Sequence, residues 1–476
     1  MAYIQFLGAA GTVTGSKHLI NSCDRDGKGG FQILVDCGMF QGAKEWRERN
    51  WQPLPIPANT IDAVILTHAH LDHCGWIPRL VKEGFRGTIY ATSATIDLCG
   101  IILPDSGHLQ EEDAEFYNKQ KRSKHVPALP LYTLEEAEDS LKYFQPLQTG
   151  ITKQLCPEMS VRFVQAAHIL GSTMAEITLK TDGQMRQLLF TGDIGRMRDS
   201  NIAPGKVIRS GPQEGETADI LVMESTYGNR QHPTTDPRPA LAELIRKTVQ
   251  RGGSIVVPAF AVERTQKFLF ILKDLMETGQ IPRVPVFADS PMAIKAVQIF
   301  LQHEEECTPD TCRLIAQFGS PLQWPGFSFA STPAESKKIN DSRYPCIIVS
   351  SSGMVTGGRI QHHLAQRLPD PRNTVIFIGF QAPGTRGAII KSGAPEVKIY
   401  GEIVPIRAQV AAFEQFSDHA DPPELLQWLR TFKNKPSTTY LVHGEPAASS
   451  QLRDTMAKEL GWNVQVAQWL QKIEVN

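Results

Sequence analysis

The segment THAHLDHCGW, residues 67–76, decides how the rest of the sequence is interpreted. Within six residues it carries four potential metal ligands, which are His68, His70, Asp72 and His73. Neutral imidazoles and carboxylates are ligands that suit zinc. His68 and His70 are two positions apart at the end of an apolar strand pattern, so they can project to the same side. We predict a metal site here. The alternative, a solvated histidine-rich loop, fits poorly with so dense a motif directly after a buried strand.

The composition limits the class of protein. The chain has 476 residues, 41% apolar and 21% charged, which is typical of a globular protein with two domains. The net charge of -1 provides no global basic field, so a polyanion would need a local basic groove or a metal. No signal peptide or membrane-spanning stretch is expected. The eight cysteines include no C-x-x-C pair, which favours reduced thiols and a cytoplasmic location.

The pattern of predicted elements changes twice along the chain. Residues 1–228 are rich in strands, whereas residues 229–405 alternate short apolar strands (GSIVVP, VPVFADS, PCIIVSSSG) with helical stretches. Such alternation is typical of βαβ units and a parallel sheet. The strand-rich style returns in residues 406–476. We therefore predict an α/β protein in which the middle domain is inserted into a host domain made of both ends of the chain.

Further candidate residues follow apolar strands or lie in polar turns. They are Asp36 (LVDCG), His168 (VQAAHILGS), Asp193 (LLFTGDIG), Glu224 (MESTYGNR), His419 (FSDHAD) and His443 (YLVHGE). Taken alone, a single histidine or a T-G-D turn is more often structural, and Asp36 could be an ordinary turn residue. His419 could be a metal ligand, a structural histidine or neither. Asp421, ahead of PPELLQWL, is expected to cap a helix.

Together these motifs resemble the metallo-β-lactamase superfamily, in which H-x-H-x-D-H is the signature. The insertion and the segments around Glu224, His419 and His443 are similar to motifs A, B and C of its β-CASP branch. That branch contains nucleic-acid nucleases, among them the mRNA 3′-end cleavage endonuclease and similar bacterial and archaeal RNases. The resemblance covers nearly the whole chain. It implies an αββα sandwich with an inserted parallel-sheet α/β (β-CASP) domain.

The resemblance also implies two zinc ions and their ligands. One ion would take His68, His70 and His168; the other would take Asp72, His73 and His443; Asp193 would bridge them. A hydroxide between the metals would attack phosphorus in line. Asp36 is similar to a carboxylate that orients ligand histidines.

The remaining catalytic residues follow from the same resemblance. Because the ligand set is complete without His419, this histidine, held by Glu224, resembles a proton donor to the leaving oxygen. We count both as catalytic, together with Asp72 and Asp36. The products would carry 5′-phosphate and 3′-hydroxyl ends. A histidine at motif C, here His443, resembles RNA-directed members of the family, so single-stranded RNA is the expected substrate.

A phosphate-binding loop is expected in the inserted domain. The segment SSSGMVTGGR follows a strand and opens a helix, so its backbone N–H groups form an anion cradle. An ordinary Gly/Ser loop is the alternative, and the segment lacks the G-K-[ST] ending of an ATP-binding P-loop. The expected phosphate ligands are Ser352, Gly353, Gly357, Gly358 and Arg359.

Three questions stay open at this level. The alternatives to a ribonuclease are a small-molecule metallo-hydrolase acting on a thioester or lactone, and a non-catalytic RNA-binding scaffold. Endonucleolytic and 5′→3′ exonucleolytic action are not distinguished. A homodimer is an open alternative for the assembly.

Overall fold

The computed structural model describes residues 1–22, 30–120, 125–197, 217–307, 324–341, 344–379 and 381–475. These residues form two compact units. Those of the first unit fall within Met1–Asp199, Ser210–Gln231 and Asp418–Asn476, and those of the second within His232–Ser417. In the described part of the chain, no helix has the length and apolarity needed to cross a membrane.

One sheet of the first unit has the strand order β22-β1-β2-β3-β4-β5-β6. The neighbours from β22 to β3 are antiparallel and those from β3 to β6 are parallel. Its strands are β1 (Tyr3–Phe6), β2 (His18–Asn21), β3 (Gln32–Val35), β4 (Ala63–Ile65), β5 (Thr88–Ala91), β6 (Phe144–Pro146) and β22 (Lys472–Glu474).

The other sheet of this unit has the order β21-β20-β11-β10-β9-β8-β7. It is antiparallel from β7 to β10 and parallel from β10 to β21. Its strands are β7 (Thr152–Cys156), β8 (Met159–Gln165), β9 (Thr173–Thr181), β10 (Gln184–Phe190), β11 (Ile220–Glu224), β20 (Thr438–Val442) and β21 (Val464–Val466).

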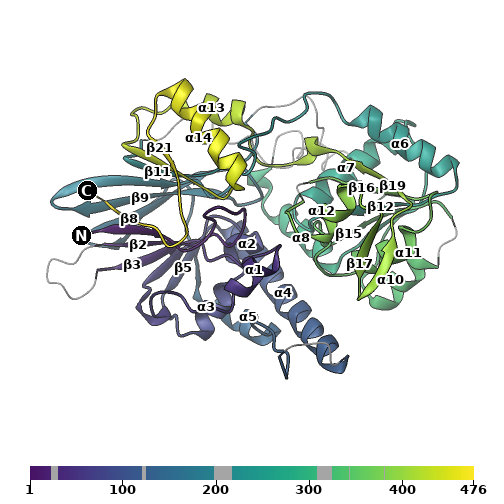
Figure 1. Ribbon diagram of the computed structural model, residues 1–476, viewed down its shortest axis with the longest axis horizontal. Coiled ribbons are helices and arrows are strands. Elements are labelled where there is room, and N and C mark those ends of the chain that lie inside the picture. Colours follow the sequence, from purple (N-terminus) through teal and green to yellow (C-terminus); the bar gives the residue numbers. More distant parts are fainter. Residues whose placement is uncertain are drawn as a thin grey trace. The chain divides into compact units, whose positions relative to one another are not determined.

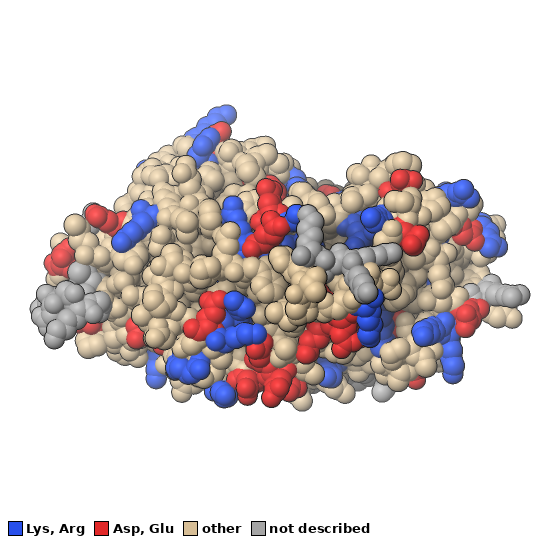
Figure 2. Space-filling view, turned by 60° about the horizontal axis from the view of Figure 1, so that its bottom comes forward, with Lys and Arg blue, Asp and Glu red and all other residues tan. Residues whose placement is uncertain are grey.

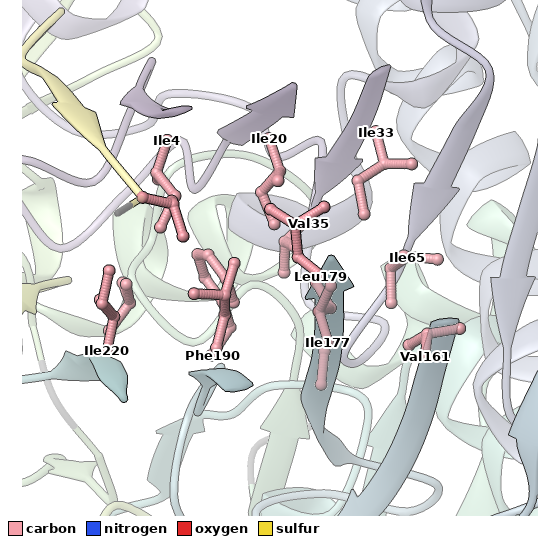
Figure 3. Close-up of a cluster of buried hydrophobic side chains, with 14 of the residues drawn as sticks. Ile4, Ile20, Ile33, Val35, Ile65, Val161, Ile177, Leu179, Phe190 and Ile220 are labelled. Carbon is pink, nitrogen blue, oxygen red and sulfur yellow. The ribbon is translucent and has the colours of Figure 1, made fainter. Parts of the chain in front are cut away.

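The two sheets pack face to face through apolar side chains (Figure 3). Ile4, Ile20 and Ile65 come from the first sheet and meet Ile177 and Phe190 from the second. All five are essentially inaccessible to solvent. Burial of apolar area on this scale is the main stabilising contribution to such a sandwich.

Helices cover the outer faces of the sandwich (Figure 1). On the second sheet, Leu221 and Leu441 pack against Trp428 of α13 and Leu452 of α14. The helical segments of the first unit are α1 (Lys44–Arg49), η1 (Ala58–Thr60), α2 (Leu71–Cys74), α3 (Ile77–Lys82), α4 (Ser93–Lys119), α5 (Leu134–Ser140), η2 (Leu141–Tyr143), α13 (Pro422–Leu429) and α14 (Pro446–Leu460).

The second unit is built on a parallel sheet of order β14-β13-β15-β12-β16-β19. Its strands are β12 (Ile255–Pro258), β13 (Val286–Asp289), β14 (Phe327–Phe329), β15 (Ile347–Ser350), β16 (Thr374–Phe377) and β19 (Gln409–Ala412), beside a hairpin of β17 (Glu396–Ile399) and β18 (Glu402–Pro405). Its helical segments are α6 (Arg238–Gln250), α7 (Arg264–Glu277), α8 (Pro291–Gln302), η3 (Glu304–Glu306), α10 (Pro333–Asn340), α11 (Ile360–Arg367), α12 (Arg386–Lys391) and η4 (Glu414–Phe416).

Both faces of this parallel sheet are buried. Val257 of β12 belongs to the apolar cluster on one face, and its neighbour Val256 belongs to the cluster on the other. Continuous apolar runs such as IVVP and TVIF are therefore required, because neither face meets water. The predicted fold class, a two-sheet sandwich flanked by helices with an inserted parallel-sheet unit, is confirmed.

Candidate active site

The predicted site residues of the first unit follow the ends of its strands. His68 comes after β4, His168 after β8, Asp193 after β10 and His443 after β20, while Glu224 is the last residue of β11. Loops that leave neighbouring strand ends meet at one edge of a sandwich. The structure brings these side chains together there, although the first and last are 375 positions apart in the sequence.

The first group of possible ligands consists of His68, His70, His168 and Asp193. His70 Nδ1 lies 3.1 Å from His68 Nε2 and 3.3 Å from His168 Nε2. Asp193 Oδ2 lies 3.5 Å from His68 Nε2 and 3.4 Å from His168 Nε2. Four ligand atoms on four side chains therefore converge on one point.

The second group consists of Asp72, His73 and His443. His443 Nε2 lies 3.2 Å from both His73 Nε2 and Asp72 Oδ2. Asp193 reaches this group with its other oxygen, because Oδ1 lies 3.3 Å from His73 Nε2. The two oxygens of Asp193 thus face different groups, which is the arrangement of a bridging carboxylate.

These separations fit a metal at the centre of each group. Ligand bonds of about 2.0–2.1 Å at angles between 90° and tetrahedral place neighbouring ligand atoms about 2.9–3.4 Å apart. The pairs above are 3.1–3.5 Å apart. Asp193 Oδ1 is also buried without a hydrogen-bond donor among the described residues. A buried carboxylate oxygen left in this state is suited to a cation.

The charged carboxylates of this buried site also favour a bound cation. Burial disfavours a charged imidazole, yet the carboxylates of Asp193 and Asp36 raise the pKa of His73 well above its ordinary value. Burial alone would raise the pKa of Asp72, but His443 and His73 lower it below its ordinary value. The carboxylates therefore stay charged and favour a proton on His73, whereas burial lowers the pKa of His68 and of His168. Divalent metals displace such protons when they bind.

Asp36 fixes the orientation of His73. Its Oδ2 lies 2.6 Å from His73 Nδ1 and accepts a hydrogen bond from Thr67 Oγ1 at 3.0 Å. Its Oδ1 accepts the backbone N–H of Thr67 at 2.8 Å. With Nδ1–H donated to this carboxylate, Nε2 presents its lone pair to the second group. Partners of this kind set the tautomer of a ligand histidine and raise its basicity.

His419 and Glu224 form a pair beside these groups. His419 Nδ1 lies 3.1 Å from both carboxylate oxygens of Glu224. The ring of His419 stacks near Tyr227, with centroids 5.9 Å apart, and lies 4.5 Å from the ring of His168. Among the described residues, His419 joins no group with the geometry of a metal site, whereas Glu224 also lies within ligand reach of Asp193 and His443.

The chain around His419 is held by its neighbours. Asp421 caps α13 in a capping box with Glu424, as expected from the sequence. Glu424 also accepts a hydrogen bond from Arg196 at 2.8 Å, and His419 forms an isolated β-bridge with Gly195. The segment that carries His419 is therefore tied to the loop that carries Asp193.

Comparison with known proteins identifies the family. The chain is 36% identical to ribonuclease TTHA0252 of Thermus thermophilus over 92% of either chain. It also matches the metallo-beta-lactamase superfamily over residues 26–226 and the Beta-Casp domain over residues 265–390. The chain belongs to the β-CASP branch of the metallo-β-lactamase superfamily. The resemblance predicted from the motifs is confirmed.

Three further matches place this β-CASP chain among its relatives. Residues 403–467 match a Zn-dependent metallo-hydrolase RNA specificity domain. Transcription termination factor FttA of Methanosarcina mazei is 32% identical over 90% of this chain and 66% of the relative. FttA of Methanocaldococcus jannaschii is 30% identical over 96% of this chain and 69% of the relative.

The predicted phosphate loop lies between β15 and α11 of the β-CASP unit. Ser352 Oγ accepts the backbone N–H of Thr356 at 3.0 Å. Gly358 has a φ of +77°, and a Cβ at Gly353 would lie 2.9 Å from a backbone nitrogen, so both positions favour glycine. Gly357 has open space around its Cα. The loop is also held from outside, because Gln381 Nε2 donates to the carbonyl of Gly353 at 2.9 Å and Arg386 Nη1 donates to that of Thr356 at 3.2 Å.

Arg359 makes more hydrogen bonds to protein oxygens than the sequence suggests. Its Nη1 donates to Asp289 Oδ1 at 2.7 Å and to the carbonyl of Ala330 at 2.8 Å, and its Nη2 donates to the carbonyl of Ser331 at 3.2 Å. Its guanidinium therefore anchors the start of α11 to β13 and β14. Only the remaining N–H groups could reach a phosphate.

The residues that support this loop lie outside the predicted set of phosphate ligands. Asp289 Oδ2 accepts a hydrogen bond from Ser336 Oγ at 2.5 Å and lies 2.7 Å from His363 Nε2. His363 Nδ1 in turn lies 2.7 Å from Asn340 Oδ1. The strand-end motif FADSP was a signal for Asp289, whereas nothing in the sequence marked the buried ring of His363.

Proposed function

We propose that this protein is a zinc-dependent ribonuclease that hydrolyses phosphodiester bonds of single-stranded RNA and leaves 5′-phosphate and 3′-hydroxyl ends. The observation that carries the proposal is the position of Asp193, whose two oxygens face separate groups of metal ligands beside the His419–Glu224 pair. The name of the Thermus relative and the match to an RNA specificity domain support RNA as substrate.

Two zinc ions would be held by the residues described above. His68, His70 and His168 would hold one, and Asp72, His73 and His443 the other, with Asp193 shared. Bound there, zinc supplies Lewis-acid stabilisation of charge on a phosphoryl oxygen and activates water at neutral pH.

The chain itself supplies the proton for the leaving group. With Nδ1–H donated to Glu224, the opposite nitrogen of His419 is the one left to protonate the departing 3′ oxygen. Glu224 is almost fully buried and stabilises the imidazolium by a charge-assisted hydrogen bond. His70 and Asp72 are the partly exposed members of the metal site, so RNA would approach on their side.

The inserted unit contributes the phosphate-binding loop in this proposal. Ser352, Gly353, Gly357 and Gly358 would offer hydroxyl and backbone N–H groups to a phosphate of the RNA. Arg359 would chiefly hold the loop in shape, because three of its hydrogen bonds go to protein oxygens.

The decisive experiment compares substrates and removes the metal. The zinc-loaded protein is incubated with 5′-labelled single-stranded RNA, the matched DNA, and a panel of thioesters and lactones, with and without a chelator. We expect chelator-sensitive cleavage of RNA and products with 3′-hydroxyl ends. Asp193→Asn should abolish cleavage, whereas Asp182→Asn, an exposed turn aspartate, should not. Turnover of a thioester or lactone without RNA cleavage would instead indicate a small-molecule hydrolase.

A circular RNA separates the two modes of cleavage. An endonuclease linearises a circle, whereas an enzyme that requires a free 5′ end leaves it intact. RNA binding without any cleavage in the metal-loaded state would favour the scaffold alternative.

A further inference from the structure

Helix α1 and the C-terminal turn of the first unit bring a cation and aromatic rings together at the surface. The guanidinium carbon of Arg49 lies 4.2 Å from the ring centre of Trp46 and 4.0 Å from that of Trp469. Phe40 lies parallel to Trp46, with centroids 6.3 Å apart and an interplanar angle of 14°. We call this set, Phe40, Trp46, Arg49 and Trp469, the Arg49 column.

The Arg49 column continues into the protein interior. On the inner side of Phe40, Lys17 Nζ lies 4.7 Å from the ring centre of Phe40 and 5.3 Å from that of Trp76. Lys17 also donates a hydrogen bond to the carbonyl of Gly38. From the core outward the order is therefore Lys17, Phe40, Trp46, Arg49 and Trp469. Such contacts contribute roughly 0.5–2 kcal/mol each, more where the cation is desolvated.

The protein holds the column rigidly. Asn50, which follows α1, exchanges two hydrogen bonds of 2.8 Å with the backbone of Phe40. Its carbonyl accepts the indole N–H of Trp76 at 2.9 Å. On the other side, the backbone N–H of Leu470 donates to the carbonyl of Phe6 at 2.8 Å, which fixes the turn that carries Trp469.

The outer end of the column is left open to a ligand. Trp469 is 41% exposed, and Arg49 is partly exposed. Among the described residues, the guanidinium of Arg49 has no hydrogen-bond acceptor. Partial burial lowers its pKa, and the carboxylate of Glu45 on the same helix opposes that shift. The guanidinium of Arg49 lies over two indole rings, which leave its N–H groups available to match the oxygens of a phosphate.

We propose that the Arg49 column is a nucleotide-binding subsite, in which Arg49 binds a phosphate of the RNA and the exposed face of Trp469 stacks on an adjoining unpaired base. Guanidinium forks and indole faces are the groups that proteins use for these two parts of a single strand. An acidic peptide would use the guanidinium and leave the indole face without a partner. The inference rests on the proposed ribonuclease function.

The subsite is connected to the segments that bear metal ligands. The backbone N–H of Met39 donates to the carbonyl of Leu71 at 2.8 Å, and the backbone N–H of Cys37 donates to the carbonyl of His73 at 2.7 Å. These contacts join the segment ahead of α1 to α2, the helix that carries Asp72 and His73. A strand bound at the metal site and running past α2 would therefore meet α1.

The test measures binding and chemistry separately. Single-turnover cleavage of a 12-nucleotide single-stranded RNA by the zinc-loaded protein gives a half-saturating protein concentration and a maximal rate. We expect Arg49→Ala to raise the half-saturating concentration roughly tenfold. Trp469→Ala should raise it roughly 5- to 100-fold, the effect of losing one stacked base. Neither should change the maximal rate more than about twofold, because no reacting group is touched.

Two further measurements, the salt dependence of RNA binding and the fluorescence of a base analogue, distinguish a subsite from a structural role. Arg49→Ala should reduce the slope of log affinity against log salt by about 0.7, the value for one phosphate contact on a single strand. The fluorescence of 2-aminopurine placed in the RNA should be quenched on binding to the wild type and not to Trp469→Ala. Trp51→Ala is the matched control, because Trp51 is 50% exposed and lies two residues after Arg49.

The outcomes are separable from those of the proposed function. If the wild type binds the RNA without cleaving it, the ribonuclease proposal fails, and anisotropy of the same RNA still tests the subsite. If the wild type cleaves and both variants bind like it, or if Trp51→Ala loses as much affinity, the subsite is refuted. Arg49→Lys and Trp469→Phe repeat the test should an alanine variant melt at a lower temperature. Displacement of RNA by polyglutamate from the wild type alone would assign the column to an acidic protein partner and overturn the proposal.

Discussion

Replacing His419 by alanine is expected to remove most RNA cleavage while leaving metal binding intact. His419 belongs to neither group of metal ligands, and its Nδ1 is taken up by Glu224. Its loss therefore removes the proton donor and no ligand. The loss of a general acid typically lowers a rate roughly 10²- to 10⁴-fold.

The companion change Glu224→Gln has a smaller expected effect, and the structure sets its size. Oε1 of Glu224 accepts the backbone N–H of Ile194 at 2.6 Å, so an amide at this position keeps its oxygen there. The amide NH₂ then takes the place of Oε2, so His419 Nδ1 keeps only a neutral oxygen that is shared with the N–H of Ile194. A charge-assisted hydrogen bond contributes about 1.5–3 kcal/mol, so we expect a rate roughly 10- to 150-fold lower. The double variant should be no slower than His419→Ala, because both changes remove one function.

The assay pairs metal analysis with a substrate that needs no acid. Single-turnover rates are measured on normal RNA and on RNA with sulfur in place of the scissile 3′ oxygen. A thiolate departs without a proton, so His419→Ala should recover most of its rate on the sulfur linkage. Asp193→Asn, as a ligand variant, should not recover.

Three results would contradict this reasoning. Loss of zinc from His419→Ala would make His419 a ligand. A rate within threefold of the wild type would remove its catalytic role. An equal defect on the oxygen and sulfur linkages would show that His419 acts somewhere other than at the leaving group.

The remaining predictions concern the metal site and the core. Asp36→Asn should weaken zinc binding roughly 10- to 100-fold, because a neutral amide is a weaker acceptor for the His73 ring N–H than the carboxylate. Competition with a chromophoric chelator measures the zinc affinity, and an unchanged affinity would contradict this prediction. His443→Ala should lower zinc content toward one ion per chain by elemental analysis, and undiminished loading would refute its assignment. Burial lowers the pKa of His18 to about 3. Below pH 6.5 the unfolded metal-free chain therefore binds a proton at His18 that the folded chain does not bind. The free energy of unfolding then falls by as much as about 1.4 kcal/mol per pH unit, down to about pH 3. Urea midpoints between pH 7 and 4 should therefore fall less in His18→Leu than in the wild type, with the exposed His108→Ala as control.

The sequence predicted the metal site well because its signals are local. The spacing of His68, His70, Asp72 and His73 follows from one strand end and the first turn of α2. The other candidates each follow a recognisable apolar strand. Since strand ends of a sandwich meet at one edge, finding the strands was enough to find the residues.

The surroundings of Arg359 could not be predicted in the same way. Its partner Asp289 is 70 positions earlier, and they meet only because β13 and β15 are neighbours in the sheet. His363 is buried between Asp289 and Asn340 for the same reason. Strand order decides these contacts, and a pattern of apolar residues reveals strands without their order.

The pairing of β11 with β20 brings Glu224 and His443 together across an insertion of nearly two hundred residues, and a β-bridge to Gly195 places His419 beside them. β11 and β20 are parallel neighbours, with Glu224 opposite Val442, so the residue after Val442 reaches the same edge as Glu224. A parallel pair requires a crossover connection but sets no upper limit on its length. The β-CASP unit has its own apolar clusters and can serve as that crossover without disturbing the pairing. The geometry of the candidate metal ligands and of His419 is therefore set within the first unit alone, and the inserted unit is free to differ in its loops without changing it.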